Sequence, residues 1–246
     1  MLLFTVNLHK HPTNTSKEIN YSMVNWQKKD TIIFDLDGTL VDTAPDLTHS
    51  LNHCLSLINI APVKLSDVRP MIGHGARAMI LTALELREKS FEENVIKDLH
   101  ESFLDFYANN IAVDTKPFPL TMEILDHLMT ANRNLGICTN KPQHLAEQLI
   151  GELKLTPYFK SIIGRDKVKN PKPHSSHLLE TIKRAGGLAE SSIFIGDSEV
   201  DFKTARAANI PIILLGHGYS PIPIESLEAD LYYKDNMGLK NLLIKK

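Results

Sequence analysis

Two aspartates, Asp35 and Asp37, directly follow the apolar and β-branched run 31–34. Such a run is typical of a buried strand, and side chains two positions apart on an extended chain point the same way. Two carboxylates about 4 Å apart repel by roughly 4 kcal/mol at an effective dielectric of about 20. A hard cation such as Mg²⁺, which takes oxygen ligands, would reverse that repulsion. The pair therefore indicates a metal site at the end of a strand; a lone Asp-x-Asp would more simply be an acidic turn.

Further polar side chains lie at the ends of other predicted strands or in nearby loops: Thr139, Asn140, Lys172, Asp197 and Asp201. In open α/β sheets, ligands bind beyond the carboxyl ends of the strands. Taken singly, Thr139 indicates a strand-end cap, Lys172 a surface lysine and Asp201 a helix cap. Together with the two aspartates, they form a set suited to phosphoryl transfer, which depends on positioning and charge neutralisation. A carboxylate can also form an aspartyl-phosphate and divide hydrolysis into two steps.

The elements that position these residues alternate along the second half of the chain. Predicted helices separate the predicted strands 135–138, 161–163, 192–195, 211–215 and 230–233. This alternation predicts an α/β fold with a parallel sheet that is covered on both faces. Residues 44–110 contain amphipathic helices and no convincing strand, so they are predicted to form a separate helical bundle.

Composition excludes several classes of protein. The 246 residues are 43% apolar and 23% charged, as in a globular protein. The net charge is −2, and acidic and basic residues are interspersed along the chain. Nothing therefore favours a nucleic-acid partner. No window reaches the roughly 18 apolar residues of a membrane span, and residues 1–6 lack the features of a signal peptide. Cys54 and Cys138 fit no metal spacing and are expected as free thiols, which predicts a cytoplasmic protein without a membrane partner.

Four ordered motifs carry a resemblance to a known superfamily: DLDGTLVD at 35–42, CTN at 138–140, PKP at 171–173 and GDSEVD at 196–201. They resemble the motifs of the haloacid dehalogenase superfamily, and the resemblance covers residues 30–246. It implies a Rossmann-like parallel sheet core formed by residues 30–43 and 114–246. Residues 44–113 would be an inserted all-helical cap. Residues 1–29 are predicted to be a flexible tail, and whether the functional protein begins at Met23 stays open.

The same resemblance implies catalytic roles for three residues. Asp35 would be the nucleophile, and Asp37 would protonate the leaving oxygen and activate the hydrolytic water. Lys172 would neutralise the nucleophile and the phosphate.

It also implies a Mg²⁺ cofactor and a phosphate-binding pair. Asp35, Asp197 and the backbone carbonyl of Asp37 would ligate the metal. Asp201 would support the metal's water shell or Lys172. Thr139 and the Asn140 amide would hold the phosphoryl oxygens.

Three further runs, 41–47, 69–77 and 205–208, are similar to phosphoglycolate phosphatases. The expected activity is therefore Mg²⁺-dependent hydrolysis of a small phosphorylated metabolite, 2-phosphoglycolate. The alternatives are a sugar-phosphate mutase of the β-phosphoglucomutase kind, and a phosphatase acting on pyrophosphate or a sugar acid phosphate. A non-catalytic regulatory protein that kept the fold is a remote alternative. Monomer and homodimer are both compatible with the sequence.

The expected substrate-selecting residues lie in the cap, in the run Gly73-His74-Gly75 and at Arg77. This run precedes the predicted helix 76–86, whose free N–H groups and positive dipole end would face an anion. Arg77 would hold a carboxylate with two hydrogen bonds. The alternative is a glycine-rich turn between two cap helices.

Overall fold

The computed structural model describes residues 25–244, and it has a six-stranded parallel sheet within that range. The strand order is β5-β4-β1-β6-β7-β8. The strands are β1 (Thr31–Phe34), β4 (Asn134–Cys138), β5 (Ser161–Ile163), β6 (Ser192–Gly196), β7 (Ile212–Leu215) and β8 (Leu231–Tyr233). The predicted α/β fold with a parallel sheet is confirmed.

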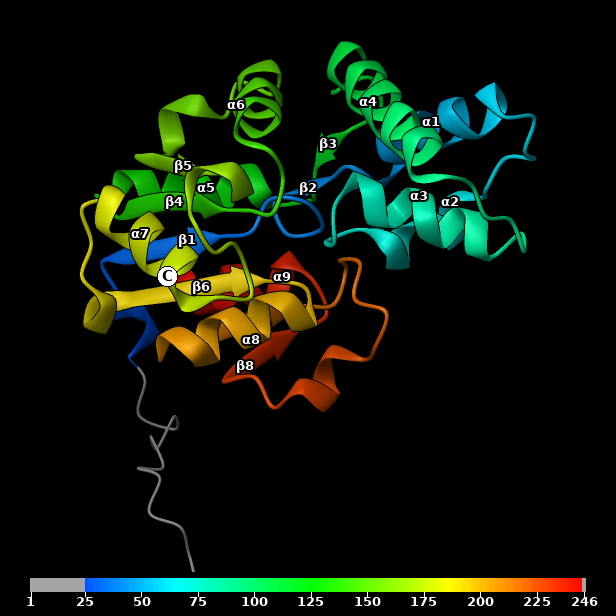
Figure 1. Cartoon of the computed structure of the whole chain (residues 1–246). Coiled ribbons are helices and arrows are strands. Elements are labelled where there is room, and N and C mark those ends of the chain that lie inside the picture. Colours follow the sequence, from blue (N-terminus) through cyan, green and yellow to red (C-terminus); the bar gives the residue numbers. More distant parts are fainter. Residues whose placement is uncertain (1–24, 245–246) are drawn as a thin grey trace, which may run out of the picture.

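Helices cover both faces of this sheet (Figure 1). On one face lie α7 (Ser175–Arg184) and α8 (Glu199–Ala208); on the other lie α5 (Thr121–Thr130), α6 (Gln143–Glu152) and α9 (Asn236–Leu243). Alternate residues of β1 serve the two faces, because Ile33 packs in the core under α7 and α8, and Ile32 in the core on the other side. Burial on both faces explains why the strands read as continuous apolar runs.

A second group of helices lies beside the sheet (Figure 1). It contains α1 (Ala44–Leu57), α2 (Leu65–Val68), α3 (Ala76–Glu85) and α4 (Glu93–Asn109). Leu51 and Leu55 of α1 and Phe103 and Tyr107 of α4 are buried in its core. We refer to this group, α1 to α4, as the cap.

Two very short strands join the cap to the sheet domain. β2 (Val41–Asp42) pairs antiparallel with β3 (Lys116–Pro117). This ribbon was not predicted, because two residues are too few to show an alternating pattern. The ribbon places side by side the two segments in which the chain passes between the sheet domain and the cap.

The predicted tail, 1–29, lies only partly within the described range. Residues 1–24, with Met23, fall outside it. Trp26–Lys28 form a short 3-10 turn, and Trp26 packs against the apolar core near α9. The end of the predicted tail is therefore part of the folded body. No helix in residues 25–244 is long and apolar enough to cross a membrane.

Candidate active site

The site is built at the carboxyl end of the central strand, β1. Phe34 is in register with Ile137 of β4 and with Ile195 of β6, so three strands end at the same edge. The Asp35 backbone N–H extends this pairing by donating to the Ile195 carbonyl at 2.9 Å. The residues that follow each strand therefore enter one crevice, as the sequence predicts.

Lys172 is the central cation of the crevice. Its Nζ lies 2.9 Å from Asp35 Oδ1 and 2.6 Å from Asp201 Oδ1, and its side chain is buried. Burial alone would lower the pKa of Lys172, but the carboxylates of Asp201 and Asp35 outweigh it and raise the pKa above its ordinary value. Lys172 is therefore a permanent positive charge beside the predicted nucleophile.

A buried histidine fixes the loop that carries Lys172. The Lys172 backbone N–H donates to His177 Nδ1 at 3.1 Å, and His177 Nε2 lies 2.9 Å from the Ile163 carbonyl. Burial lowers the pKa of His177 to about 4, so the ring is neutral with its proton on Nε2. Sequence reasoning gave His177 no role, because its partners are backbone groups that leave no spacing pattern.

Gly38 allows the acidic loop to pass close to Asp197. Its φ is +88°, and a Cβ at this position would lie 2.5 Å from Asp197 Oδ2. The next residue, Thr39, donates its hydroxyl to Asp197 Oδ1 at 2.8 Å, and the Tyr219 backbone N–H donates to Oδ2 at 2.7 Å. These contacts hold the carboxylate of Asp197 in place beside β1.

Three carboxylates form a cluster that fits a metal ion. One oxygen each of Asp35, Asp197 and Asp201 lies within 4.8 Å of the others. Burial, then the Asp201 and Asp35 carboxylates, raise the pKa of Asp197 well above its ordinary value. Burial also raises the pKa of Asp35 to about 7, against the opposing effect of Lys172. Lys172 alone does not balance this charge, and a hard divalent cation would.

Asp201 serves two of the roles that the sequence left open. Its Oδ2 accepts hydrogen bonds from the Ser198 backbone N–H at 3.2 Å and the Ser198 hydroxyl at 2.6 Å, which caps the first turn of α8. Its Oδ1 contacts Lys172. Asp201 thus holds both the start of α8 and the Lys172 side chain.

Asp37 has a partner that sequence reasoning missed. Lys141 Nζ lies 2.8 and 3.1 Å from the two carboxylate oxygens of Asp37, and 4.7 Å from the centre of the Tyr107 ring of the cap. Burial alone would lower the pKa of Lys141, but Asp37 and Tyr107 raise it overall. Lys141 directly follows Asn140 in the loop after β4, and this position was the signal in the sequence that could have identified it as a site residue. The pair holds the Asp37 side chain in place in the crevice.

Thr139 and Asn140 lie in the same crevice. Thr139 is buried, and its Oγ1 accepts a hydrogen bond from the Lys141 backbone N–H at 3.1 Å. The Asn140 amide donates to the Lys172 carbonyl at 3.2 Å and to the Gly73 carbonyl of the cap at 3.4 Å. Asn140 Oδ1 is buried and has no hydrogen-bond partner in the described part of the chain. Asn140 therefore connects the two walls of the site.

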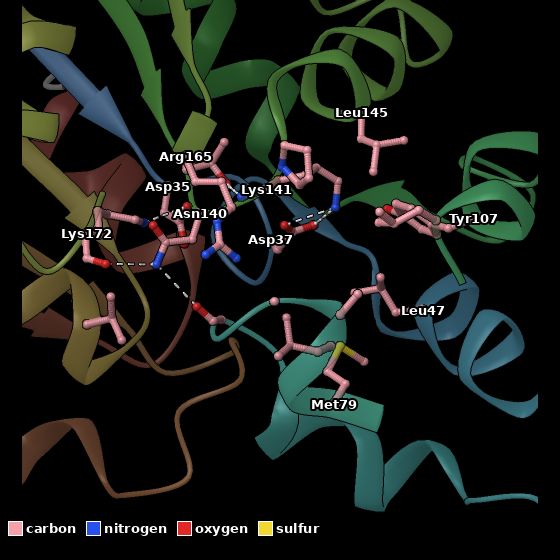
Figure 2. Close-up of a pocket in the computed structure, with 18 of the residues that line it drawn as sticks. Asp35, Asp37, Leu47, Met79, Tyr107, Asn140, Lys141, Leu145, Arg165 and Lys172 are labelled. Atoms are coloured by element: carbon pink, nitrogen blue, oxygen red, sulfur yellow. Dashed lines mark hydrogen bonds and ion pairs between the residues drawn. The ribbon is translucent and has the colours of Figure 1, made fainter. Parts of the chain in front are cut away.

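A cavity of about 80 Å³ lies between the sheet and the cap. Its sheet-side lining includes the site residues Asp35, Asp37, Thr139, Asn140, Lys141 and Lys172. Figure 2 shows Asp35, Asn140 and Lys172 on the sheet side and Leu47, Met79 and Tyr107 on the cap side. The further cap-side lining is apolar at Ile72, Phe103 and Leu104, with His100 as its one titratable side chain among the described residues. This volume is far below the roughly 300–1,000 Å³ of pockets for drug-sized ligands, which favours a small substrate.

The four cap residues expected to select the substrate divide into two pairs. Gly73 and Gly75 line the cavity, whereas His74 and Arg77 are not among its lining residues. Arg77 instead forms an ion pair with Glu93 at 2.7 Å, and both side chains are exposed. The structure therefore places a different charge near Gly75, as described below.

Comparison with known proteins agrees with this geometry. The model of a protein family described as "Haloacid dehalogenase-like hydrolase" matches residues 32–215, most of the chain. The chain belongs to this family. The matched range includes all of the catalytic and metal-ligating residues expected from the sequence, and the predicted superfamily is confirmed.

Relatives within this hydrolase family cover nearly the same length. A phosphoglycolate phosphatase of Agrobacterium fabrum is 42% identical over 87% of this chain and 92% of its own. A phosphoglycolate phosphatase of Caulobacter vibrioides is 39% identical over 82% of this chain and 85% of its own. A crystal structure of a predicted phosphoglycolate phosphatase from Haemophilus somnus has a TM-score of 0.82 at 26% identity, covering 88% of this chain and 99% of that one.

Proposed function

We propose that this hydrolase is a Mg²⁺-dependent phosphatase that converts 2-phosphoglycolate and water into glycolate and phosphate. The observation that carries the proposal is the buried array in which Lys172 touches both Asp35 and Asp201 at the floor of a small cavity. A carboxylate nucleophile, a fixed ammonium group and an acidic cluster are the parts that phosphoryl transfer needs.

In the first step, a carboxylate oxygen of Asp35 attacks phosphorus and forms an aspartyl-phosphate, while the bond between phosphorus and the glycolate oxygen breaks. Asp37 gives a proton to that oxygen. In the second step, water attacks phosphorus, its proton passes to the Asp37 carboxylate, and Asp35 leaves as a free carboxylate. Thr139 and the Asn140 amide orient the phosphoryl oxygens, and Lys172 offsets their charge.

The acidic cluster supports Mg²⁺ as the cofactor. Asp35, Asp197 and Asp201 would hold the ion, directly or through its water shell, with the Asp37 backbone carbonyl as a further ligand. When bound, Mg²⁺ neutralises the charge that develops on the phosphoryl group. Because the pKa of Asp35 and of Asp197 is raised, a cation at this place also keeps both groups in the ionised form that the reaction requires.

The choice of 2-phosphoglycolate rests on the names of the Agrobacterium and Caulobacter relatives and on the size of the cavity. A small phosphorylated metabolite as the substrate, a monomeric or homodimeric protein without a nucleic-acid or membrane partner, and a cytoplasmic location belong to the same proposal. A sugar phosphate is the competing substrate that the family offers, and the apolar cap wall argues against it because a sugar's hydroxyl groups would lack partners there.

A substrate panel tests this function. Phosphate release is measured at equal concentrations of 2-phosphoglycolate, β-glucose 1-phosphate, pyrophosphate and p-nitrophenyl phosphate, with Mg²⁺ and with excess chelator. We expect 2-phosphoglycolate to give a kcat/KM at least about tenfold above the others, and the chelator to abolish turnover. Formation of glucose 6-phosphate without net phosphate release would show a mutase, and full turnover in chelator would contradict the metal.

A further inference from the structure

Arg165 is the one cavity-lining residue whose positive charge has no acidic partner in residues 25–244. Lys172 and Lys141 line the cavity as well, but each forms an ion pair with a catalytic aspartate. Arg77 of the cap pairs with Glu93. Among the described residues, no carboxylate lies within ion-pair distance of Arg165, whose side chain is exposed.

The backbone of Arg165 is held firmly. Its N–H donates to the backbone carbonyl of Lys141 at 3.1 Å. Lys141 is also the residue whose side chain pairs with Asp37. The neighbouring N–H, of Gly164, donates to Gln143 Oε1 at 2.6 Å. The adjacent acid, Asp166, accepts from the Gln143 backbone N–H at 2.7 Å, which caps α6 and engages it away from the arginine.

The guanidinium group of Arg165 reaches from the sheet domain to the cap. A Cβ at Gly75 would lie 2.7 Å from Arg165 Nη1, so the guanidinium group approaches the cap loop closely. Figure 2 shows Arg165 and Asn140 together at the same cavity as Asp35. His100 of α4 also lines this region, and its pKa is lowered by burial and by the charges of Arg165 and Arg77. Arg165 thus brings to this cavity a positive charge that belongs to neither the Lys172–Asp35 pair nor the Lys141–Asp37 pair.

We propose that Arg165 determines substrate specificity by binding the carboxylate at the far end of the substrate from the phosphoryl group. The inference rests on the proposed function, because it assumes a small phosphate ester with a second anionic group. A planar guanidinium offers two parallel hydrogen bonds to a carboxylate. Because Arg165 has no acidic partner among the described residues, no existing ion pair has to break when it binds a substrate carboxylate. Its close approach to the cap loop at Gly75 also places the guanidinium group where the two walls of the cavity meet.

The test compares two esters that differ only in the distal group, 2-phosphoglycolate and 2-hydroxyethyl phosphate. For Arg165→Ala we expect kcat/KM on 2-phosphoglycolate to fall about 10- to 100-fold, chiefly through KM, since a charge-assisted hydrogen-bonded pair is lost. On 2-hydroxyethyl phosphate the change should stay below about threefold. Arg165→Lys should recover part of the loss. Lys167→Ala, in the same exposed turn but outside the cavity lining, is the matched control and should match the wild type on both esters.

The outcomes separate this inference from the proposed function. If the wild type prefers 2-phosphoglycolate and Arg165→Ala lowers both esters equally or neither, the inference about Arg165 is overturned and the function stands. If Arg77→Ala shows the selective loss instead, the cap arginine expected from the sequence is the carboxylate-binding residue, and Arg165 is again excluded. A wild type that does not prefer 2-phosphoglycolate overturns the function and the inference together.

Discussion

The sheet side and the cap side of the cavity differ in the polarity of the side chains that line them. On the sheet side, buried charges are matched to specific partners, as in the contacts of Lys172 with Asp35 and Asp201 and of Lys141 with Asp37. On the cap side, the lining side chains are mainly apolar, as at Leu47, Ile72 and Met79. Preorganised charges serve the chemistry, whereas an apolar wall excludes water and limits size.

This difference predicts two kinds of mutational effect. A change on the sheet side removes stabilisation of the transition state and lowers kcat by orders of magnitude. A change on the cap side alters a contact that substrate and transition state share, and so raises KM by smaller factors.

The largest expected effect is that of Asp35→Asn. It removes the nucleophile and with it the covalent route, so kcat should fall by roughly 10⁴-fold or more. The substitution also removes a buried carboxyl whose pKa is raised, so the melting temperature should equal or exceed that of the wild type. Steady-state kinetics with thermal unfolding separates the two. Activity within tenfold of the wild type in a folded variant would remove Asp35 from the mechanism.

Lys141→Met should have the next largest effect. Without this ammonium group, the carboxylate of Asp37 loses the ion pair that fixes its orientation. We expect kcat to fall about 100-fold, because a proton donor that is no longer held in place transfers protons less efficiently. Lys183→Met, at an exposed position on α7, is the control and should leave kcat unchanged. A kcat within about threefold of the wild type in a folded Lys141→Met variant would show that this lysine does not position Asp37 for the reaction.

The raised pKa values of the acidic cluster predict how stability changes with pH. The pKa of Asp35 is about 7 in the folded protein against 3.8 ordinarily, so the folded state binds more protons between these values. Stability of the metal-free protein should therefore fall as pH rises from about 4 to 7. Mg²⁺ favours the ionised form, so it should raise the melting temperature by several degrees at pH 8 and by less at pH 5.5. An equal Mg²⁺ effect at both pH values would place the metal elsewhere.

The smallest expected effect is on the cap side. Met79→Ala shortens a buried side chain in the cavity wall and should raise KM about 3- to 10-fold, with kcat within about twofold. Leu81→Ala, on the exposed side of the same helix, is the matched control and should leave KM unchanged. A kcat loss as large as that of Lys141→Met would contradict the division between the two walls.

The sequence predicts most of the fold because long-range pairing here follows local patterns. The four central strands, β1, β4, β6 and β7, are apolar runs buried on both faces, and each helix that covers the sheet has a clear apolar side. The ribbon β2–β3 was not predicted, because each of its strands is only two residues long. Trp26 was placed in a tail because its packing partners lie far along the chain.

In the site, residues inside the motifs were predicted, and the residues that hold them were not. Lys141 and His177 act through single contacts to Asp37 and to the Lys172 backbone, which depend on the three-dimensional path of the loops. Arg77 and Arg165 are both arginines near a glycine-rich turn, and only the structure shows that Glu93 pairs with the first. A cation is available to a ligand only where the fold places no acidic side chain beside it, and the sequence does not show this.

The central claim is that Asp35 becomes covalently phosphorylated. The most direct test is to quench the Asp37→Asn variant in acid during turnover of p-nitrophenyl phosphate. Its leaving group departs without a proton, so the variant slows only hydrolysis of the intermediate, which accumulates. Borohydride then reduces an acyl phosphate to an alcohol, which peptide mass spectrometry locates. We predict the reduced side chain at position 35 and nowhere else. Phosphate on a serine or histidine, or product formation with position 35 unmodified throughout, would contradict the account.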